Sequence, residues 1–235
     1  MSENKRRSLG QHFLTSDLVA KSIVDLAAIK KSDVVLEVGT GKGILIPYLC
    51  DKAEKVISVE KDSRLYIEAK RKFSNVKNLT LEHGDAFEMD MDFTIFVSNL
   101  PYSESRNAME WLVQRKFSHA VIMVQKEFAQ KLLEGKGKGR RAISVLVSYC
   151  MEMTKLMDVK KTHFQPQPKV DSVVLCLEPK QMVSEDIIMA VNKLFSYKRK
   201  TMRNIARQFD LTVDSDKRLE DLSDGEIINI AKKII

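Results

Sequence analysis

The 235-residue chain is poor in cysteine: it has only Cys50, Cys150 and Cys176, and no Cys-x-x-Cys pair. A sparse, odd set of cysteines without a signal peptide favours reduced thiols and a cytoplasmic protein. We predict that all three thiols serve packing, with a catalytic thiol as the alternative. The His, Cys and Asp residues also lack metal-ligand spacing, so the sequence predicts no metal site.

Long apolar runs are also missing. No run approaches the roughly 18 residues that a membrane-spanning helix needs, and the first residues, MSENKRR, lack the apolar core of a signal peptide. Hydrophobic residues make up 44% and charged residues 30% of the chain, which is typical of globular proteins and too apolar for a disordered one. The net charge of +7 favours polyanionic partners, although charge alone is weak evidence. The sequence therefore predicts no membrane association.

Short apolar segments alternate with helical patterns in the first half of the chain. The apolar segments are residues 34–38, 55–60, 78–85, 93–100 and 119–125. The helical patterns are residues 15–29, 43–53, 63–73 and 105–116. Strands that alternate with helices in this way predict an α/β fold with a parallel sheet and helices on both faces.

Two further strands are expected later in the chain. Residues 142–151 fit either a helix or a strand, and a helix is favoured. Residues 154–160 and 170–178 read as strands that lie too close in sequence for a helical crossover, so we expect them to pair antiparallel. The predicted sheet then has seven strands and an antiparallel end.

The pattern is wholly helical near the C-terminus. Ser223 and Glu226 have the spacing of a capping box for a last helix over residues 225–235. We therefore predict two domains, an α/β domain over residues 1–180 and a small helical domain over residues 181–235.

A glycine-rich segment, EVGTGKG at residues 37–43, stands where the first strand meets the next helix. Gly39 and Gly41 would let the backbone turn tightly and approach a ligand, although a tight turn without a ligand has the same pattern. Position 44 is isoleucine and not the third glycine of the dinucleotide fingerprint. No Lys followed by Ser or Thr completes a P-loop, so neither of these two nucleotide motifs fits.

Polar side chains end the next three predicted strands: Glu60, Asp85 and Asn99. In an open parallel sheet, ligands bind outside the carboxyl ends of the strands. An acid at the position of Glu60 can accept hydrogen bonds from both ribose hydroxyls of a nucleoside. One acid after a strand is often only a turn former, but these three residues in register with the glycines predict a nucleoside site.

The segment SNLPY at residues 98–102 places an amide, a proline and an aromatic ring after the fourth strand. The exocyclic amino group of adenine is a poor nucleophile because its lone pair is delocalised into the ring. Hydrogen bonds to the Asn99 side-chain oxygen and to a backbone carbonyl near Leu100 or Pro101 would favour a pyramidal nitrogen. The ring of Tyr102 offers a stacking face, worth about 1–3 kcal/mol per base. The alternative is a proline turn with a core tyrosine.

In these and other segments, the chain resembles the family of rRNA adenine N6,N6-dimethyltransferases that act on the small subunit. The matching segments are LGQHFL (9–14), EVGTGKG (37–43), VEKD (59–62), GDA (84–86), SNLPY (98–102), VQKEFAQKL (124–132), HFQPQPKVDSVV (163–174) and FSYKRKTMRN (195–204). The resemblance implies a Rossmann-like class I methyltransferase fold with S-adenosylmethionine as the methyl donor. It also implies dimethylation of N6 of two adjacent adenosines near the 3′ end of small-subunit rRNA, in ribosome biogenesis.

The same resemblance assigns roles to individual residues. The donor-binding positions fall on His12, Leu14, Gly39, Glu60, Asp85 and Asn99. The base-gripping positions fall on Asn99, Leu100, Pro101 and Tyr102, with Phe164 as a second stacking ring. A loop histidine is the alternative for His12, and a core side chain is the alternative for Phe164.

The C-terminal region separates its charges. Residues 187–207 contain six basic residues and no acid, whereas residues 208–231 carry a net charge of −5. We predict that RNA is bound by Lys198, Arg199, Lys200, Arg203 and Arg207. The three arginines have i, i+4 spacing, which on one helix costs about 0.2–0.5 kcal/mol per like-charged pair; a phosphate backbone would reverse this penalty. A solvated basic face is the alternative, and KRR (5–7) and KGKGRR (136–141) would extend the basic track.

Three other functions fit the sequence less well. The related enzymes that methylate large-subunit rRNA and confer macrolide resistance share FLTS and GTGKG runs, but more often have Asn-Ile-Pro-Tyr in place of Asn-Leu-Pro-Tyr. The complete set of ligand-suited residues disfavours a non-catalytic nucleic-acid-binding relative, and the isoleucine at position 44 disfavours a nicotinamide dehydrogenase. We therefore expect a monomeric, cytoplasmic small-subunit rRNA dimethyltransferase that acts on the 30S precursor particle.

Overall fold

The structure, a computed structural model, describes residues 12–133, 137, 139–212 and 215–235. The chain forms two compact units. The first unit comprises the described residues up to Ala108, Lys116–Glu127 and Met153–Glu178, and the second comprises Met109–Arg115, Phe128–Glu152 and Pro179–Ile235. The last segment of the second unit begins next to the predicted boundary at residue 180, but its two earlier segments were not expected. The two-domain division at residue 180 stays a prediction.

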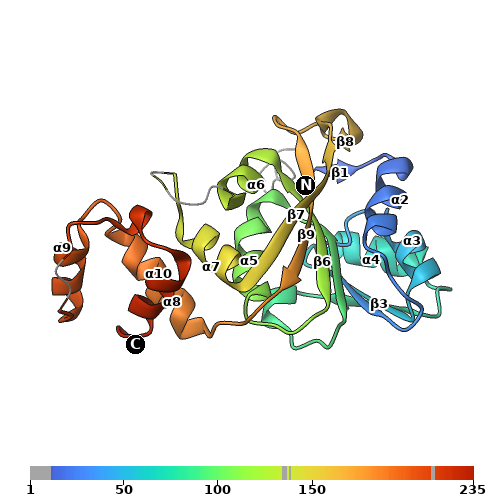
Figure 1. Cartoon of the computed structure of the whole chain (residues 1–235). Helices are drawn as coiled ribbons and strands as arrows, with labels where there is room; N and C mark the ends of the chain where they lie inside the picture. The colour runs from blue at the N-terminus through green and yellow to red at the C-terminus, as the bar shows by residue number, and fades with distance from the viewer. Residues whose placement is uncertain (1–11, 134–136, 138, 213–214) are drawn as a thin grey trace. The chain divides into compact units, whose positions relative to one another are not determined.

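Seven strands form one sheet in the order β4-β3-β2-β5-β6-β9-β7 (Figure 1). They are β2 (Val34–Val38), β3 (Lys55–Glu60), β4 (Leu79–His83), β5 (Ile95–Asn99), β6 (His119–Gln125), β7 (Met151–Val159) and β9 (Ser172–Pro179). The neighbours from β4 to β6 run parallel, and β9 runs antiparallel to β6. This topology confirms the predicted α/β class and the antiparallel end of the sheet.

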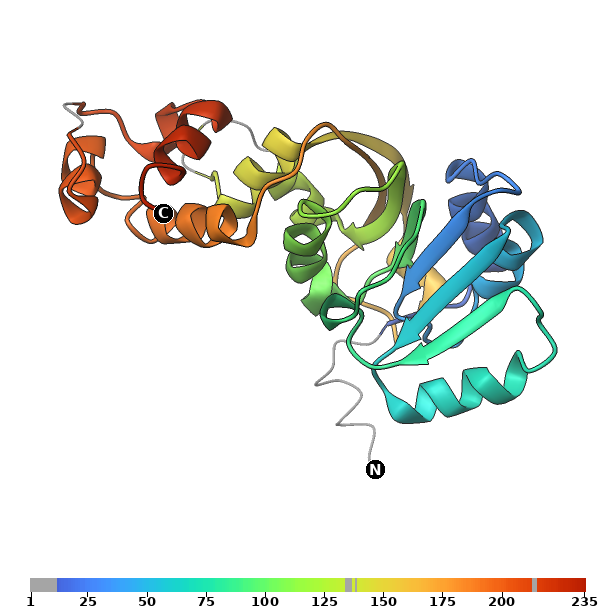
Figure 2. The same cartoon turned by 90° about the horizontal axis from the view of Figure 1, so that it is seen from below.

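Helices alternate with the strands as the sequence predicts. They are α2 (Asp17–Leu26), α3 (Ile46–Lys52), α4 (Ser63–Lys72), α5 (Ser105–Leu112) and α6 (Lys126–Leu133). Side-chain caps fix where two of these helices begin. Ser16 accepts a hydrogen bond from the first turn of α2, and Asp62 accepts two from the first turn of α4. Figure 2 shows α4 beside β4, the edge strand of the sheet.

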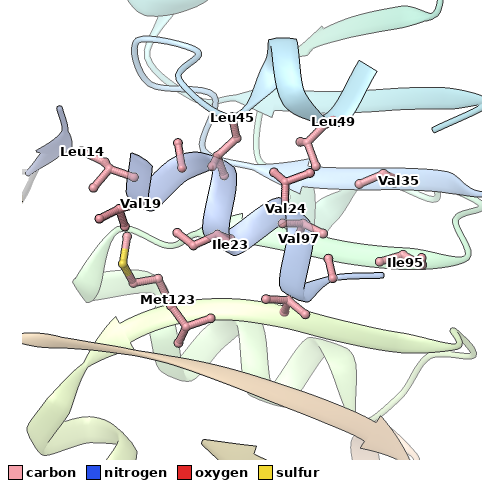
Figure 3. Close-up of a cluster of buried hydrophobic side chains, with 14 of the residues drawn as sticks. Leu14, Val19, Ile23, Val24, Val35, Leu45, Leu49, Ile95, Val97 and Met123 are labelled. Atoms are coloured by element: carbon pink, nitrogen blue, oxygen red, sulfur yellow. The ribbon is translucent and has the colours of Figure 1, made fainter. Parts of the chain in front are cut away.

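The core lies on both faces of the sheet. On one face, Val19 and Ile23 of α2 belong to a cluster of buried side chains that includes Val97 of β5 (Figure 3). Successive strand residues point to opposite faces. Leu36 and Phe96, which point away from this cluster, are also fully buried. Burial on both faces explains why these strands read as continuous apolar runs rather than as alternating ones.

A second, two-stranded sheet joins segments that are far apart in the sequence. Strand β1 (Phe13–Leu14) pairs antiparallel with β8 (Phe164–Gln165), and the two lie side by side in Figure 1. Thr15 extends this pairing, because its N–H and its hydroxyl both donate to the carbonyl of His163. No periodic pattern in the sequence predicts strands of two residues.

Three helices pack together in the second unit: α7 (Ala142–Cys150), α8 (Glu185–Ser196) and α10 (Asp224–Ala231). The helix that was favoured for residues 142–151 is confirmed, and Ser223 and Glu226 form the predicted capping box of α10. Arg140 is buried and binds Asp224 as well as the carbonyls of Leu219 and Leu222. This arginine ties the start of α7 to the start of α10.

The expected stacking of three arginines on one helix is wrong. Helix α8 ends at Ser196, and Arg199 lies in the turn before α9 (Met202–Ala206). Thr201 has an extended backbone and forms a β-bridge with Arg218. Pairing with this later segment interrupts the helix, so tertiary contacts outweigh the local helical pattern here.

The cysteine prediction agrees with the structure, since Cys50, Cys150 and Cys176 are all free thiols. Burial raises the pKa of the Cys50 thiol to about 11 and that of the Cys150 thiol to about 12, so both stay protonated and unreactive near neutral pH. Among the described residues, no cluster of three His, Cys, Asp or Glu side chains could hold a metal ion. Within the same part of the chain, no helix has the length and apolarity to cross a membrane.

Candidate functional site

A pocket of about 650 Å³, including its open mouth, lies at the carboxyl ends of β2, β3 and β5. It brings together eight of the predicted site residues: His12, Leu14, Gly39, Glu60, Asn99, Leu100, Pro101 and Tyr102. Asp85 and Phe164 are not among its lining residues. Three strand ends and the short strand β1 therefore supply one cavity, as expected from the carboxyl edge of a parallel sheet.

The glycine loop, residues 39–43, has a backbone conformation that lets it pack closely against neighbouring side chains. Gly39 has a φ of +84°, which only glycine adopts at little cost, and its N–H donates to the carbonyl of Val59 at 2.8 Å. A Cβ added at Gly39 would lie 3.3 Å from Cδ of Pro101. At Gly43 an added Cβ would lie 2.3 Å from the ring of Phe73. The glycines therefore let the loop pack tightly between the proline of the SNLPY segment and α4.

Glu60 is buried and holds this loop in place. Its Oε2 accepts the N–H of Gly41 at 2.8 Å, and its Oε1 accepts the N–H of Asp62 at 2.8 Å. A carboxylate can accept about four hydrogen bonds in total. Two backbone donors therefore leave capacity for the two hydroxyls of a ribose.

Glu37 lines the same pocket, and it was missed as a site residue from the sequence. Its Oε2 accepts the hydroxyl of Ser58 at 2.5 Å, and that hydroxyl is 2.6 Å from the hydroxyl of Thr40. Burial raises the pKa of Glu37 to about 8, and the negative charge of Glu60 also raises it, while the Ser58 hydrogen bond opposes the rise. The Glu37 carboxyl is thus mostly uncharged near neutral pH. The sequence feature that could have identified Glu37 is its position as the single acid in an otherwise apolar strand.

The SNLPY segment presents its polar groups to the pocket. Ser98 anchors the end of β5 by donating to the carbonyl of Val38 at 2.5 Å. The side chain of Asn99 makes no hydrogen bond with the part of the chain that the structure describes, so its oxygen is available to a ligand. The carbonyl of Pro101 already accepts the N–H of Glu104 at 2.8 Å. This bond uses one of the two acceptor sites of the Pro101 carbonyl, which favours the carbonyl of Leu100 as the predicted backbone acceptor.

Tyr102 is held from two sides. Its hydroxyl is 2.8 Å from the hydroxyl of Ser172, and its ring centroid is 5.4 Å from that of His12. The Nδ1 of His12 is in turn 2.8 Å from the carbonyl oxygen of Pro166, in the loop after β8. Burial raises the pKa of the Tyr102 hydroxyl, and the charge of Asp171 adds to this, while the Ser172 bond opposes it. The ring is a neutral, oriented surface.

Two predicted residues are engaged elsewhere in this conformation. Burial alone would raise the pKa of Asp85, but the hydrogen bonds from Lys61 at 2.7 Å and from the N–H of Phe87 hold it below its usual range. Phe164 is only 3% exposed and packs in the core cluster with Leu14. This burial favours the core alternative for Phe164. The donor-binding role of Asp85 and the stacking role of Phe164 stay predictions.

The predicted RNA-binding residues lie in the second unit. Lys198, Arg199, Lys200 and Arg207 are exposed, and the ammonium of Lys200 lies over the ring of Tyr197. Arg203 differs, because its Nη1 is 3.3 Å from Oδ1 of Asp216. Of the segments that would extend the basic track, residues 5–7, 136 and 138 lie outside the described residues. Of the five predicted residues, Lys198, Arg199, Lys200 and Arg207 form no ion pair with the part of the chain that the structure describes.

The comparisons with known proteins agree on one family. The family model for ribosomal RNA adenine dimethylase matches residues 2–235. Ribosomal RNA small subunit methyltransferase A of Thermotoga neapolitana is 37% identical over 233 residues, which cover 96% of this chain and 90% of that protein. The probable small subunit methyltransferase A of Methanopyrus kandleri is 34% identical over 208 residues, 85% of this chain and 75% of that protein.

Solved structures give the same result. The crystal structure of a dimethyladenosine transferase from Plasmodium falciparum has a TM-score of 0.80 at 28% identity, covering 94% of this chain and 98% of that one. The 23S rRNA methyltransferase ErmE has a TM-score of 0.67 at 21% identity, covering 94% and 99%, and shows likeness of fold alone. With a class I methyltransferase fold and a family match over almost its whole length, the chain belongs to the ribosomal RNA adenine dimethylase family.

Proposed function

We propose that this chain transfers methyl groups from S-adenosylmethionine to N6 of two adjacent adenosines near the 3′ end of small-subunit rRNA. The observation that carries the proposal is the single pocket in which Glu60, Asn99 and Tyr102 meet the glycine loop, in a member of this family. The Thermotoga neapolitana and Methanopyrus kandleri relatives, which are 37% and 34% identical to this chain, are both named for the small subunit. The likeness to the large-subunit enzyme is one of fold, so the small subunit is the better-supported substrate.

The donor half of the pocket fits a nucleoside with a flexible tail. Gly39 and Gly41 line the pocket with φ angles of +84° and +56°, so the loop turns here without side chains and a ligand can approach its backbone. Glu60 accepts hydrogen bonds from the ribose hydroxyls, and His12 and Leu14 line the pocket beside the loop. Asp85 is the expected acceptor for the adenine amino group. When bound, the donor supplies a methyl group on a positively charged sulfur, which leaves as a neutral thioether.

The acceptor half activates a flat base. Tyr102 stacks on a target adenine that has been extruded from its helix. The free-energy cost of this extrusion is lowest for unpaired adenosines in loops. The Asn99 oxygen and the Leu100 carbonyl accept hydrogen bonds from the N6 amino group, which makes the nitrogen pyramidal and localises its lone pair. These bonds strengthen as the nitrogen reacts, so they favour the transition state over the ground state. Attack makes the amine acidic, and its proton passes to water without a strong general base.

The test of this function compares substrates. Labelled S-adenosylmethionine and the full chain are incubated with unmethylated 30S subunits, 50S subunits or naked rRNA, and the modified base is identified as N6,N6-dimethyladenosine by mass spectrometry. We expect transfer to the small-subunit rRNA. Transfer to 50S subunits would instead support the macrolide-resistance type, and no transfer to any rRNA would support a non-catalytic relative.

A paired variant tests the SNLPY mechanism. Asn99→Ala should lower the rate of transfer roughly tenfold or more, since it removes a hydrogen bond worth about 1.5 kcal/mol in the transition state. Asn75→Ala, which changes the same residue type at an exposed turn, is the control. If Asn99→Ala methylates 30S subunits at the rate of Asn75→Ala while its melting temperature falls by several degrees, the segment is a structural turn.

We further propose that the chain acts as a cytoplasmic monomer on the 30S precursor particle and that the basic residues of the second unit bind RNA. Replacing Arg199, Arg203 and Arg207 with glutamine should lower the slope of log K against log salt by about two to three units. The lower value is expected because Arg203 is already paired with Asp216. The control replaces Lys217, Lys232 and Lys233, three exposed lysines of the same unit. Equal slopes in the two variants would support the solvated-face alternative.

A further inference from the structure

The loop between β7 and β9 carries three exposed lysines. Residues 160–170 contain Lys160, Lys161 and Lys169 and no Asp or Glu. Every one of these lysines has an exposed side chain, and none forms an ion pair with the part of the chain that the structure describes. The loop as a whole therefore carries a net charge of +3. None of these three lysines has a role in the functional site described above.

Strand pairing places this loop at the same edge of the sheet as the pocket. Ser172, the first residue of β9, pairs with Gln125, the last residue of β6. Strand β6 runs parallel to β5, which ends at Asn99. The chain that enters β9 therefore lies at the carboxyl edge, where SNLPY forms the acceptor half of the pocket.

The lysine loop is connected to the acceptor ring through neighbouring residues. Oδ1 of Asp171 accepts the backbone N–H of Lys161 at 2.9 Å. The hydroxyl of the next residue, Ser172, is 2.8 Å from the hydroxyl of Tyr102. The middle of the loop reaches the same ring through His12, which contacts both Tyr102 and the carbonyl of Pro166. The loop thus frames Tyr102 from two sides.

The charges around the ring are asymmetric. Two acids flank the loop: Asp158 forms an ion pair with Lys155 at 2.6 Å, whereas Asp171 accepts only the backbone N–H of Lys161 and keeps its negative charge. In the chain that follows Tyr102, by contrast, the first charged residue is Glu104. On the side of the loop, a polyanion that approaches the acceptor ring therefore meets three lysines against the single negative charge of Asp171, so the net charge there is positive. On the side of Glu104 it meets a negative charge.

We propose that Lys160, Lys161 and Lys169 bind the phosphates of the rRNA strand that flank the target adenosine. This inference rests on the proposed function and adds a second RNA-binding surface, on the first unit. A base stacked on Tyr102 brings its own backbone to the rim of the pocket, where these lysines supply positive charge. Their binding offsets part of the cost of extruding the base, which is a few kcal/mol for a paired base and least for an unpaired one. They act on substrate binding and leave the donor half unchanged.

The experiment replaces the three lysines with glutamine in the full chain and measures binding to a small-subunit 3′-terminal hairpin RNA at several salt concentrations. Each contact to single-stranded RNA contributes roughly 0.7 units of salt slope, so the slope should fall by about two units. The control is Lys30→Gln/Lys55→Gln/Lys77→Gln, three exposed lysines near the amino ends of β2, β3 and β4 at the opposite edge of the sheet. A triple arginine variant at positions 160, 161 and 169 should retain the wild-type slope.

Two results separate this inference from the proposed function. A glutamine variant with the same salt slope and the same kcat/KM for 30S subunits as the control variant would overturn the lysine surface, even if the wild-type chain is fully active. A wild-type chain that transfers no methyl group to any rRNA would refute the proposed function. In that case, the salt slopes of the glutamine and control variants would still show whether the three lysines bind RNA. Donor affinity, measured by calorimetry, should be equal in all variants.

Discussion

Replacing Glu60 with glutamine keeps the size of the side chain but removes its charge and one of its two acceptor oxygens. In the structure the two carboxylate oxygens accept the N–H groups of Gly41 and Asp62, each at 2.8 Å. A glutamine oxygen can serve only one of them and leaves the other N–H facing an amino group. A hydrogen bond to a charged group is worth about 1.5–3 kcal/mol, so the free energy of unfolding should fall by about that amount.

The same substitution should weaken donor binding. If Glu60 also accepts from a ribose hydroxyl, the loss of another charge-assisted bond of about 1.5–3 kcal/mol raises the Kd for S-adenosylmethionine about 10- to 150-fold. For a chain of this size, the loss of stability corresponds to a fall in Tm of about 3–12 °C. Isothermal titration calorimetry gives the first quantity and thermal unfolding gives the second.

Glu82→Gln is the matched control, because Glu82 is exposed on β4 and lies opposite Val59 of β3. Glu82→Gln makes the same chemical change on the neighbouring strand. We expect this variant to have the wild-type affinity for S-adenosylmethionine and the wild-type Tm. The reasoning about Glu60 is refuted if Glu60→Gln binds S-adenosylmethionine within twofold of Glu82→Gln and melts at the same temperature.

Three further predictions concern stability and the acceptor ring. Gly43→Ala should destabilise the fold by about 2–5 kcal/mol in denaturant unfolding, since its Cβ meets the Phe73 ring at 2.3 Å and φ is +69°; Gly225→Ala, with open space around it, should not. The pKa of Glu37 is raised from near 4.5 to about 8, so the unfolded chain loses this proton first as pH rises. The difference in Tm between the wild-type chain and Glu37→Gln should therefore change in favour of the variant as the pH rises from 5 to 8. A difference that stays constant over this range would contradict the conclusion that Glu37 is buried and protonated. Tyr102→Phe should keep kcat/KM for 30S subunits within a few-fold, whereas Tyr102→Ala should not if the ring acts by stacking.

The sheet and most of the pocket could be predicted because they follow from short-range patterns. Buried strands read as apolar runs, and the residue that ends each parallel strand lies at a shared edge. Gly39, Glu60 and Asn99 could therefore be placed together from the order of the strands alone. The resemblance to a family then supplied the identity of the ligands, which spacing alone does not give.

Other features depend on contacts between distant segments and had no local signal. Glu60 was expected to bind a ribose, but its backbone bond to Gly41 appears only when two strand ends meet. Thr201 interrupts a helical pattern because it pairs with Arg218, which lies 17 positions further along the chain. Phe164 carries the family's motif, yet its pairing with β1 places the ring in the core. Each of these features depends on a contact between segments that are far apart in the sequence.

The pairing of β1 with β8 has a consequence for the order in which the protein is made. His12 emerges early in synthesis, but its partner Pro166 follows 154 residues later. Until that partner is made, the first strands and the glycine loop exist without the ladder that holds the N-terminal wall of the pocket. A nascent or C-terminally truncated chain that stops before residue 163 therefore lacks a finished acceptor ring. We therefore expect the chain to become able to methylate late in synthesis, although all the residues that line the pocket lie in its first half.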